Sequence, residues 1–146
     1  SRGLPMDEVV VRKLDTLGRC LARVIECTPP SLEDLLNDYM RQDVIVLNLE
    51  RSVQACVDIG LHIFSGRNEL VPDSMGEVFV RLARMGVLDE VTACALKGAV
   101  GFRNIAVHAY QEIDYAIVFN ICTKHLDDFR AFARQVMEAM EGADGQ

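Results

Sequence analysis

The segment from Asp43 to Phe64 constrains the fold most, because apolar residues lie on most of its sides when it is wound as a helix. A helix that is hydrophobic all round is stable in water only where other helices cover it. The flanking segments repeat apolar residues at helical spacings, and no alternating strand pattern competes with them. Because the connections are short, we expect an all-α, up-down antiparallel bundle of four to five helices around this segment.

Turn and capping residues divide the rest of the chain into further helices. Residues from about 6 to 27 predict an amphipathic helix, which Pro29 and Pro30 end. We expect one domain over residues 1–146, with a cloning remnant at 1–5 before a native Met6 and a flexible polar tail at 142–146. Four later helices are expected to begin at the N-caps Ser31, Ser74, Asp89 and Asp114.

The composition excludes several classes of protein. Five cysteines are scattered without a Cys-x-x-Cys pair, which argues against a disulfide framework and a zinc site and favours buried thiols in a reducing cytoplasm. The sequence contains no run of 18 apolar residues, so it predicts no membrane-spanning helix. The net charge of −7 argues against a general nucleic-acid binder, since affinity for phosphate backbones comes mainly from cationic surface. We expect no cofactor.

A cluster of polar side chains stands out in residues 103–110, which follow a stretch of small and apolar residues. Asn104 and His108 lie one turn apart on one helical face, and Arg103 can reach over on its long stem. Tyr110 points elsewhere unless the helix ends near it. The segment can therefore present a guanidinium, an amide and an imidazole to one point, with a phenol at the rim.

This arrangement of Arg103, His108 and Tyr110, with Asn104 after the arginine, resembles the motif of the HEPN superfamily and specifically of HepT-like toxins. The motif sits late in an all-helical chain and before one last long helix, and the resemblance covers residues from Met6 to about 141. It implies a homodimeric, metal-independent endoribonuclease of a toxin–antitoxin pair. It also implies a minimal nucleotidyltransferase antitoxin that silences the enzyme by transferring AMP to Tyr110.

The residue types suit RNA cleavage without a metal. His108 can act as a base toward a 2′-hydroxyl when neutral and as an acid toward the leaving oxygen when protonated. Arg103 suits the charge that develops on the phosphoryl oxygens. Two motifs facing across a two-fold axis would supply base and acid together, and RNA but not DNA would be cut, leaving a 2′,3′-cyclic phosphate. Asn104 can donate to the phosphate or orient the imidazole, and the sequence favours neither.

Asp58 is unusual in an apolar helix and lies on the same face as His62. This spacing is also used by metal ligands, but two ligands do not make a site, and we expect no metal. We expect Asp58 to support the site by pairing with Arg103 or His108, because an acid there needs a partner. A plain contact between helices explains Asp58 about as well.

Two further expectations concern assembly and a rival function. The small residues around the motif would let a second protomer approach it closely, which favours a homodimer with its axis near this helix. These small residues are Gly98, Ala99, Gly101, Ala106 and Ala109.

The rival function is a non-catalytic nucleotide- or substrate-binding partner subunit of a nucleotidyltransferase, which the acidic composition suits. A basic collar around the motif would favour the enzyme, and an acidic one would argue against it.

Overall fold

The computed structural model describes residues 7–144, which are mostly helical and contain no β-strand. The all-α prediction is thereby confirmed. The remnant predicted at residues 1–5 lies outside the described residues, as do Gly145 and Gln146. In chain order the α-helices are α1 (Glu8–Cys27), α2 (Leu32–Leu36), α3 (Tyr39–Gly66), α4 (Met75–Arg84), α5 (Glu90–His108), α6 (Tyr115–Asn120) and α7 (Leu126–Asp144).

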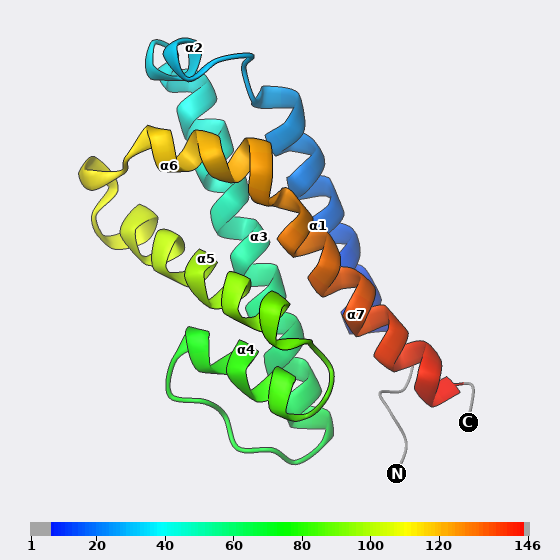
Figure 1. The fold of residues 1–146 in the computed structure, drawn as a ribbon. Helices are drawn as coiled ribbons and strands as arrows, with labels where there is room; N and C mark the ends of the chain where they lie inside the picture. Colours follow the sequence, from blue (N-terminus) through cyan, green and yellow to red (C-terminus); the bar gives the residue numbers. More distant parts are fainter. Residues whose placement is uncertain (1–6, 145–146) are drawn as a thin grey trace.

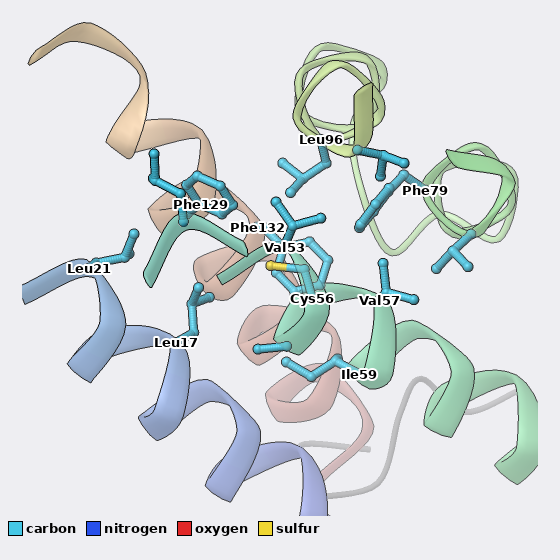
Figure 2. Close-up of a cluster of buried hydrophobic side chains, with 14 of the residues drawn as sticks. Leu17, Leu21, Val53, Cys56, Val57, Ile59, Phe79, Leu96, Phe129 and Phe132 are labelled. Atoms are coloured by element: carbon cyan, nitrogen blue, oxygen red, sulfur yellow. The ribbon is translucent and has the colours of Figure 1, made fainter. Parts of the chain in front are cut away.

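Helix α3 runs through the middle of the molecule, and α1, α5 and α7 lie around it with alternating directions (Figure 1). Figure 2 shows side chains from the long helices converging on Cys56 of α3, whose thiol is fully buried. The rings of Phe79 in α4 and Phe132 in α7 meet edge to face with centroids 5.9 Å apart. The apolar segment is therefore the core helix of an up-down bundle, but it is not covered on all sides, because Val44 and Leu47 near its start stay exposed.

The predicted helix starts are confirmed by their hydrogen bonds. Each cap side chain accepts from a backbone N–H in the first turn, which satisfies a donor that has no partner within the helix. Asp7 also caps α1, and its carboxylate accepts from the backbone N–H of Val9 at 2.7 Å. The distances are 3.1 Å at Ser31, 3.3 Å at Ser74, 2.7 Å at Asp89 and 2.9 Å at Asp114.

Gly60 sets the distance between α3 and α4. A Cβ atom at this position would overlap with Cγ1 of Val78 and lie 3.2 Å from Cδ1 of Leu82. The missing side chain lets the short α4 settle directly on the backbone of α3, which brings Phe79 into the core.

The last helical region differs from the single helix expected after Asp114. A π-helical segment, Ile121–His125, joins α6 to α7 into one continuous helical rod, which changes direction between α6 and α7 (Figure 1). The helix also continues to Asp144, so the tail predicted at 142–146 is helical as far as that residue. Within the described residues, no helix is both long enough and apolar enough to span a membrane.

Candidate active site

The motif occupies the C-terminal end of α5, where this helix lies against the N-terminal half of α3. The structure places Arg103 and Asn104 in the last turns of α5, His108 at its final residue, and Tyr110 in the 3₁₀ turn Tyr110–Glu112 that follows. The two helices are antiparallel, so that Arg103 lies beside the middle of α3 and Tyr110 beside its beginning.

Arg103 is half-buried and held on two sides. Its Nη2 donates to Oε1 of Gln54 in α3 at 3.4 Å, and its Nη1 donates to Oδ1 of the neighbouring Asn104 at 3.4 Å. Both contacts are long, and a guanidinium carries five N–H donors. The side chain is thus oriented while most of its donors stay available to a ligand. Asn104 contacts Arg103 and makes no hydrogen bond with the imidazole of His108.

Asp58 does not pair with Arg103 or His108, which corrects the expected contact. Its Oδ2 binds Nζ of Lys13 in α1 at 3.2 Å, and its Oδ1 accepts from Nε2 of Gln54 at 2.8 Å. Gln54 stands one turn before Asp58 and fills the space between the carboxylate and the guanidinium. Asp58 thus makes the plain contact between helices that was the alternative expectation, and Gln54 connects it to the guanidinium.

Sequence reasoning missed Gln54. The available signal was its spacing: Gln54 and Asp58 are four residues apart, so they share one face of the predicted core helix. A second polar residue on the face of a supposedly covered helix indicates a polar contact with a neighbouring helix.

His62 belongs to a different cluster from Asp58. Its Nε2 lies 2.8 Å from Oδ2 of Asp7, which joins the N-cap of α1 to the C-terminal half of α3. The hydrogen bond from His62 lowers the pKa of Asp7 below its usual range. Within residues 7–144, no group of three or more His, Cys, Asp or Glu side chains has the arrangement of a metal site.

His108 ends α5 with its side chain exposed, and it has no hydrogen-bond partner within the described residues. The backbone leaves the helix at Ala109, which has φ −141° and ψ 49°. This change of direction turns Tyr110 back toward α3. The imidazole is therefore accessible to a substrate or a second protomer, with both ring nitrogens open to proton transfer.

Tyr110 is anchored to α3 although 45% of its surface is exposed. Its hydroxyl donates to Oδ1 of Asp43, and this hydrogen bond raises the pKa of the phenol well above its usual value. Asp43, Glu50 and Tyr110 line one shallow hollow together with two apolar residues of α3. Carboxylates rather than cations thus surround the phenol, so this end of the motif lacks the basic collar that would favour an enzyme.

A mostly apolar groove of about 610 Å³ runs between α5 and the α6–α7 rod. Gly98, Gly101 and Ile105 line its α5 side, and no atom of residues 7–144, apart from the adjoining backbone of α5 and the glycines' chain neighbours, lies within 4 Å of a Cβ placed at either glycine. Their small size is therefore not required by packing within the protomer. Ala106, in contrast, is buried in the protomer's own core, so this small residue is not available to a second protomer.

The all-helical bundle, with an arginine, a histidine and a tyrosine gathered at the end of one helix, has the features expected for the HEPN class. A family model described as "Ribonuclease HepT-like" matches residues 17–136 of the chain. The chain belongs to this HepT-like family.

Individual relatives agree with this assignment. A Shewanella oneidensis protein named "mRNA nuclease HepT" is 35% identical over 127 residues, which are 87% of this chain and 95% of the relative. An Aphanizomenon flos-aquae protein named "tRNA nuclease HepT" is 27% identical over 128 residues, 88% of this chain and 87% of the relative. A solved structure described as a tri-AMPylated Shewanella oneidensis HEPN toxin in complex with MNT antitoxin superposes with a TM-score of 0.85 at 33% identity, covering 91% of this chain and 99% of that chain.

Proposed function

We propose that the protein is the toxin of a toxin–antitoxin pair and acts as an endoribonuclease through Arg103 and His108. The observation that carries this proposal is the pairing of a scaffold-anchored arginine with an exposed histidine on α5, in a chain 35% identical to a protein named as an mRNA nuclease. Arginine supplies a fixed positive charge at a phosphate, and an accessible imidazole supplies proton transfer.

The cleavage step follows from these two groups. A neutral His108 takes the proton of the 2′-hydroxyl while that oxygen attacks the neighbouring phosphorus atom. Arg103 stabilises the negative charge that accumulates on the phosphoryl oxygens. The bond to the 5′-oxygen breaks, and this oxygen takes a proton from a protonated imidazole, leaving a 2′,3′-cyclic phosphate and a 5′-hydroxyl. DNA resists because it lacks the 2′-hydroxyl.

One protomer offers one motif histidine, so we propose a homodimer in which two copies of α5 face a shared cleft. The groove beside Gly98 and Gly101 supports this arrangement, because the glycines leave space that the protomer itself does not fill. Gly101→Arg is expected to leave the protomer folded and shift it to monomers in sedimentation, since a Cβ at this position has open space around it and the long side chain can extend into the groove. Gly18→Arg, at an equally open glycine of α1, is the matched control. A wild-type protein that sediments as a monomer at micromolar concentration contradicts the dimer.

Silencing is proposed to act at Tyr110, through AMP transferred by a minimal nucleotidyltransferase antitoxin. The support is the exposed phenol at the edge of the motif and the solved HEPN toxin described as tri-AMPylated in complex with its MNT antitoxin. An added AMP brings negative charge and bulk to the end of α5 that carries Arg103 and His108, so it repels the RNA backbone and blocks cleavage.

A second candidate function is a non-catalytic partner subunit that holds a nucleotide or substrate for the nucleotidyltransferase. The carboxylates of Asp43 and Glu50 beside Tyr110 favour it, because they repel an RNA backbone at that end of the motif. The two candidates differ in one measurement, which is cleavage of RNA by the purified protein in the presence of a chelator. We expect fragments ending in a cyclic phosphate and none from the matching DNA. Intact RNA after prolonged incubation with the isolated, dimeric protein contradicts the nuclease and supports the partner subunit.

A further inference from the structure

A line of polar contacts leads from α1 through α3 to the arginine of the motif. Nζ of Lys13 binds Oδ2 of Asp58 at 3.2 Å, Nε2 of Gln54 donates to Oδ1 of Asp58 at 2.8 Å, and Nη2 of Arg103 donates to Oε1 of Gln54 at 3.4 Å. Lys13, Asp58, Gln54 and Arg103 are all half-buried. The position of the guanidinium therefore depends on residues of two other helices.

The order of charges along this line fixes which way the Gln54 amide points. An ionised carboxylate only accepts hydrogen bonds and a guanidinium only donates them, whereas an amide can do both. The NH₂ group of Gln54 must face Asp58, and its carbonyl oxygen must face Arg103. The reversed amide would place two acceptors together on one side and two donors on the other. Lys13 occupies the second oxygen of Asp58 and holds this carboxylate in place.

A neutral residue at position 54 has a consequence for the charge at the site. A carboxylate in contact with Arg103 would form a charge-assisted pair and cancel the positive charge that a phosphate needs. The amide oxygen orients the guanidinium through a weak, long hydrogen bond and leaves its full charge available. The formal charges of Lys13 and Asp58 cancel one another, so the relay adds no net charge beside Arg103.

We propose that Gln54 is a positioning residue, which holds the Arg103 guanidinium toward the substrate phosphate without neutralising it and is itself oriented by Asp58 and Lys13. This proposal rests on the nuclease function proposed above. It assigns the polar face of α3 to the reaction and gives Asp58 an indirect role.

The first experiment compares three variants in steady-state RNA cleavage. Gln54→Ala is expected to lower kcat about tenfold with a smaller change in KM, since the arginine is present but poorly oriented. Gln54→Glu is expected to act mainly on KM and to weaken its dependence on salt, because the new carboxylate pairs with Arg103. Gln42→Ala is the matched control, because this glutamine of α3 contacts only the backbone of α2 and should keep the wild-type rate.

A double-mutant cycle of Gln54→Ala with Arg103→Lys separates the positioning of the guanidinium from a general destabilisation of the fold. The lysine keeps a charge but lacks the planar fork that Gln54 holds, so adding Gln54→Ala to Arg103→Lys should change the rate less than twofold, in contrast to its tenfold effect on the wild type. An equally large effect in both backgrounds overturns the proposal, as does a Gln54→Ala rate equal to that of Gln42→Ala.

A spectroscopic measurement keeps this proposal distinct from the nuclease function. The side-chain nitrogen signals of Arg103 are followed by NMR in the wild type and in Gln54→Ala. We expect restricted rotation of the guanidinium in the wild type and faster averaging in the variant, whether or not the protein cleaves RNA. Unchanged Arg103 signals overturn the positioning role. Failure of the wild type to cleave RNA, with the expected NMR change, overturns the nuclease function alone.

Discussion

Arg103 and His108 lie little more than one helical turn apart on α5, yet the chain holds them in opposite ways. The guanidinium is half-buried and connected through Gln54 and Asp58 to α1, whereas the imidazole ends its helix exposed and without a hydrogen-bond partner in the described part of the chain. Tyr110 combines both conditions, because its hydroxyl is tied to Asp43 while its ring remains at the surface.

The difference corresponds to what each group has to do in the proposed reaction. A charge that stabilises a transition state is most effective when its direction is fixed in advance. A proton-transfer group must meet atoms that arrive with the substrate, and a modified tyrosine must be reached by another protein. The scaffold therefore anchors the first group and leaves the others accessible.

The largest effect is expected from the exposed end of the motif. His108→Ala should lower the rate of RNA cleavage by about 10²- to 10⁴-fold, because the proton-transfer group is lost. The thermal stability should hardly change, since the side chain makes no contact that the fold needs. His62→Ala is the control, because this histidine is structural, and its variant should cleave at the wild-type rate below its melting temperature. Wild-type cleavage by His108→Ala means that the site is wrong.

The anchored end is expected to give the next largest effect. Arg103→Ala should lower kcat by about 10²- to 10³-fold through the loss of charge stabilisation. In contrast to His108→Ala, it should also destabilise the fold slightly, because Gln54 then loses the partner of its carbonyl oxygen. Stopped-time cleavage assays and thermal melts on the same preparations test both statements. Equal melting temperatures for Arg103→Ala and His108→Ala would show that the fold depends on the Arg103 side chain no more than on that of His108.

Tyr110→Phe tests the residue that is both anchored to α3 and exposed at the surface. We expect cleavage to stay within about twofold of the wild type, since the phenol has no part in the chemistry, and the hydrogen bond to Asp43 to contribute only about 1 kcal/mol to stability. After incubation with the antitoxin, ATP and magnesium, mass spectrometry should find AMP on the Tyr110 peptide of the wild type and none on the variant, which stays active. A variant silenced as fully as the wild type shows that inhibition needs only complex formation.

The smallest effect is expected far from the motif, at the pair of Asp7 and His62. The folded pKa of Asp7 lies below its ordinary value of 3.8, so the charge of Asp7 stabilises the fold above that pH and this contribution disappears as the pH falls through the lowered value. Asp7→Asn keeps an N-cap and removes the charge. It should cost at most about 1 kcal/mol near neutral pH, because the pair is partly exposed, and progressively less below about pH 4. A difference in melting temperature that persists at pH 2 contradicts this origin.

Local chemistry made much of the fold predictable. The caps at Ser31, Ser74, Asp89 and Asp114 depend on side chains and backbone within a few residues of one another, so the sequence contains the whole interaction. The core helix was predictable for a similar reason, since the apolar character of most of its sides is a property of its own residues.

The contacts of the candidate site were predictable only in part. The members of the motif are neighbours in sequence, whereas Gln54 and Asp43 reach it from α3, and their partners depend on how two helices align. The pairing of Asp58 was misjudged on this account, because one turn of a helix separates a direct contact from a relayed one. The π-helical segment was missed because its residues are compatible with an ordinary helix.

The π-helical segment Ile121–His125 divides the helical residues 115–144 into two parts, α6 and α7, whose side chains follow different registers. Ile117 on α6 lines the groove beside α5, whereas Phe132 on α7 is fully buried in the core. A π-helical turn holds about one residue more than an α-helical turn, so the side chains of α7 follow those of α6 about one residue out of the ordinary α-helical register. One 3.6-residue apolar stripe therefore cannot be drawn from α6 through α7, and the buried face has to be assigned separately on each side of Ile121–His125.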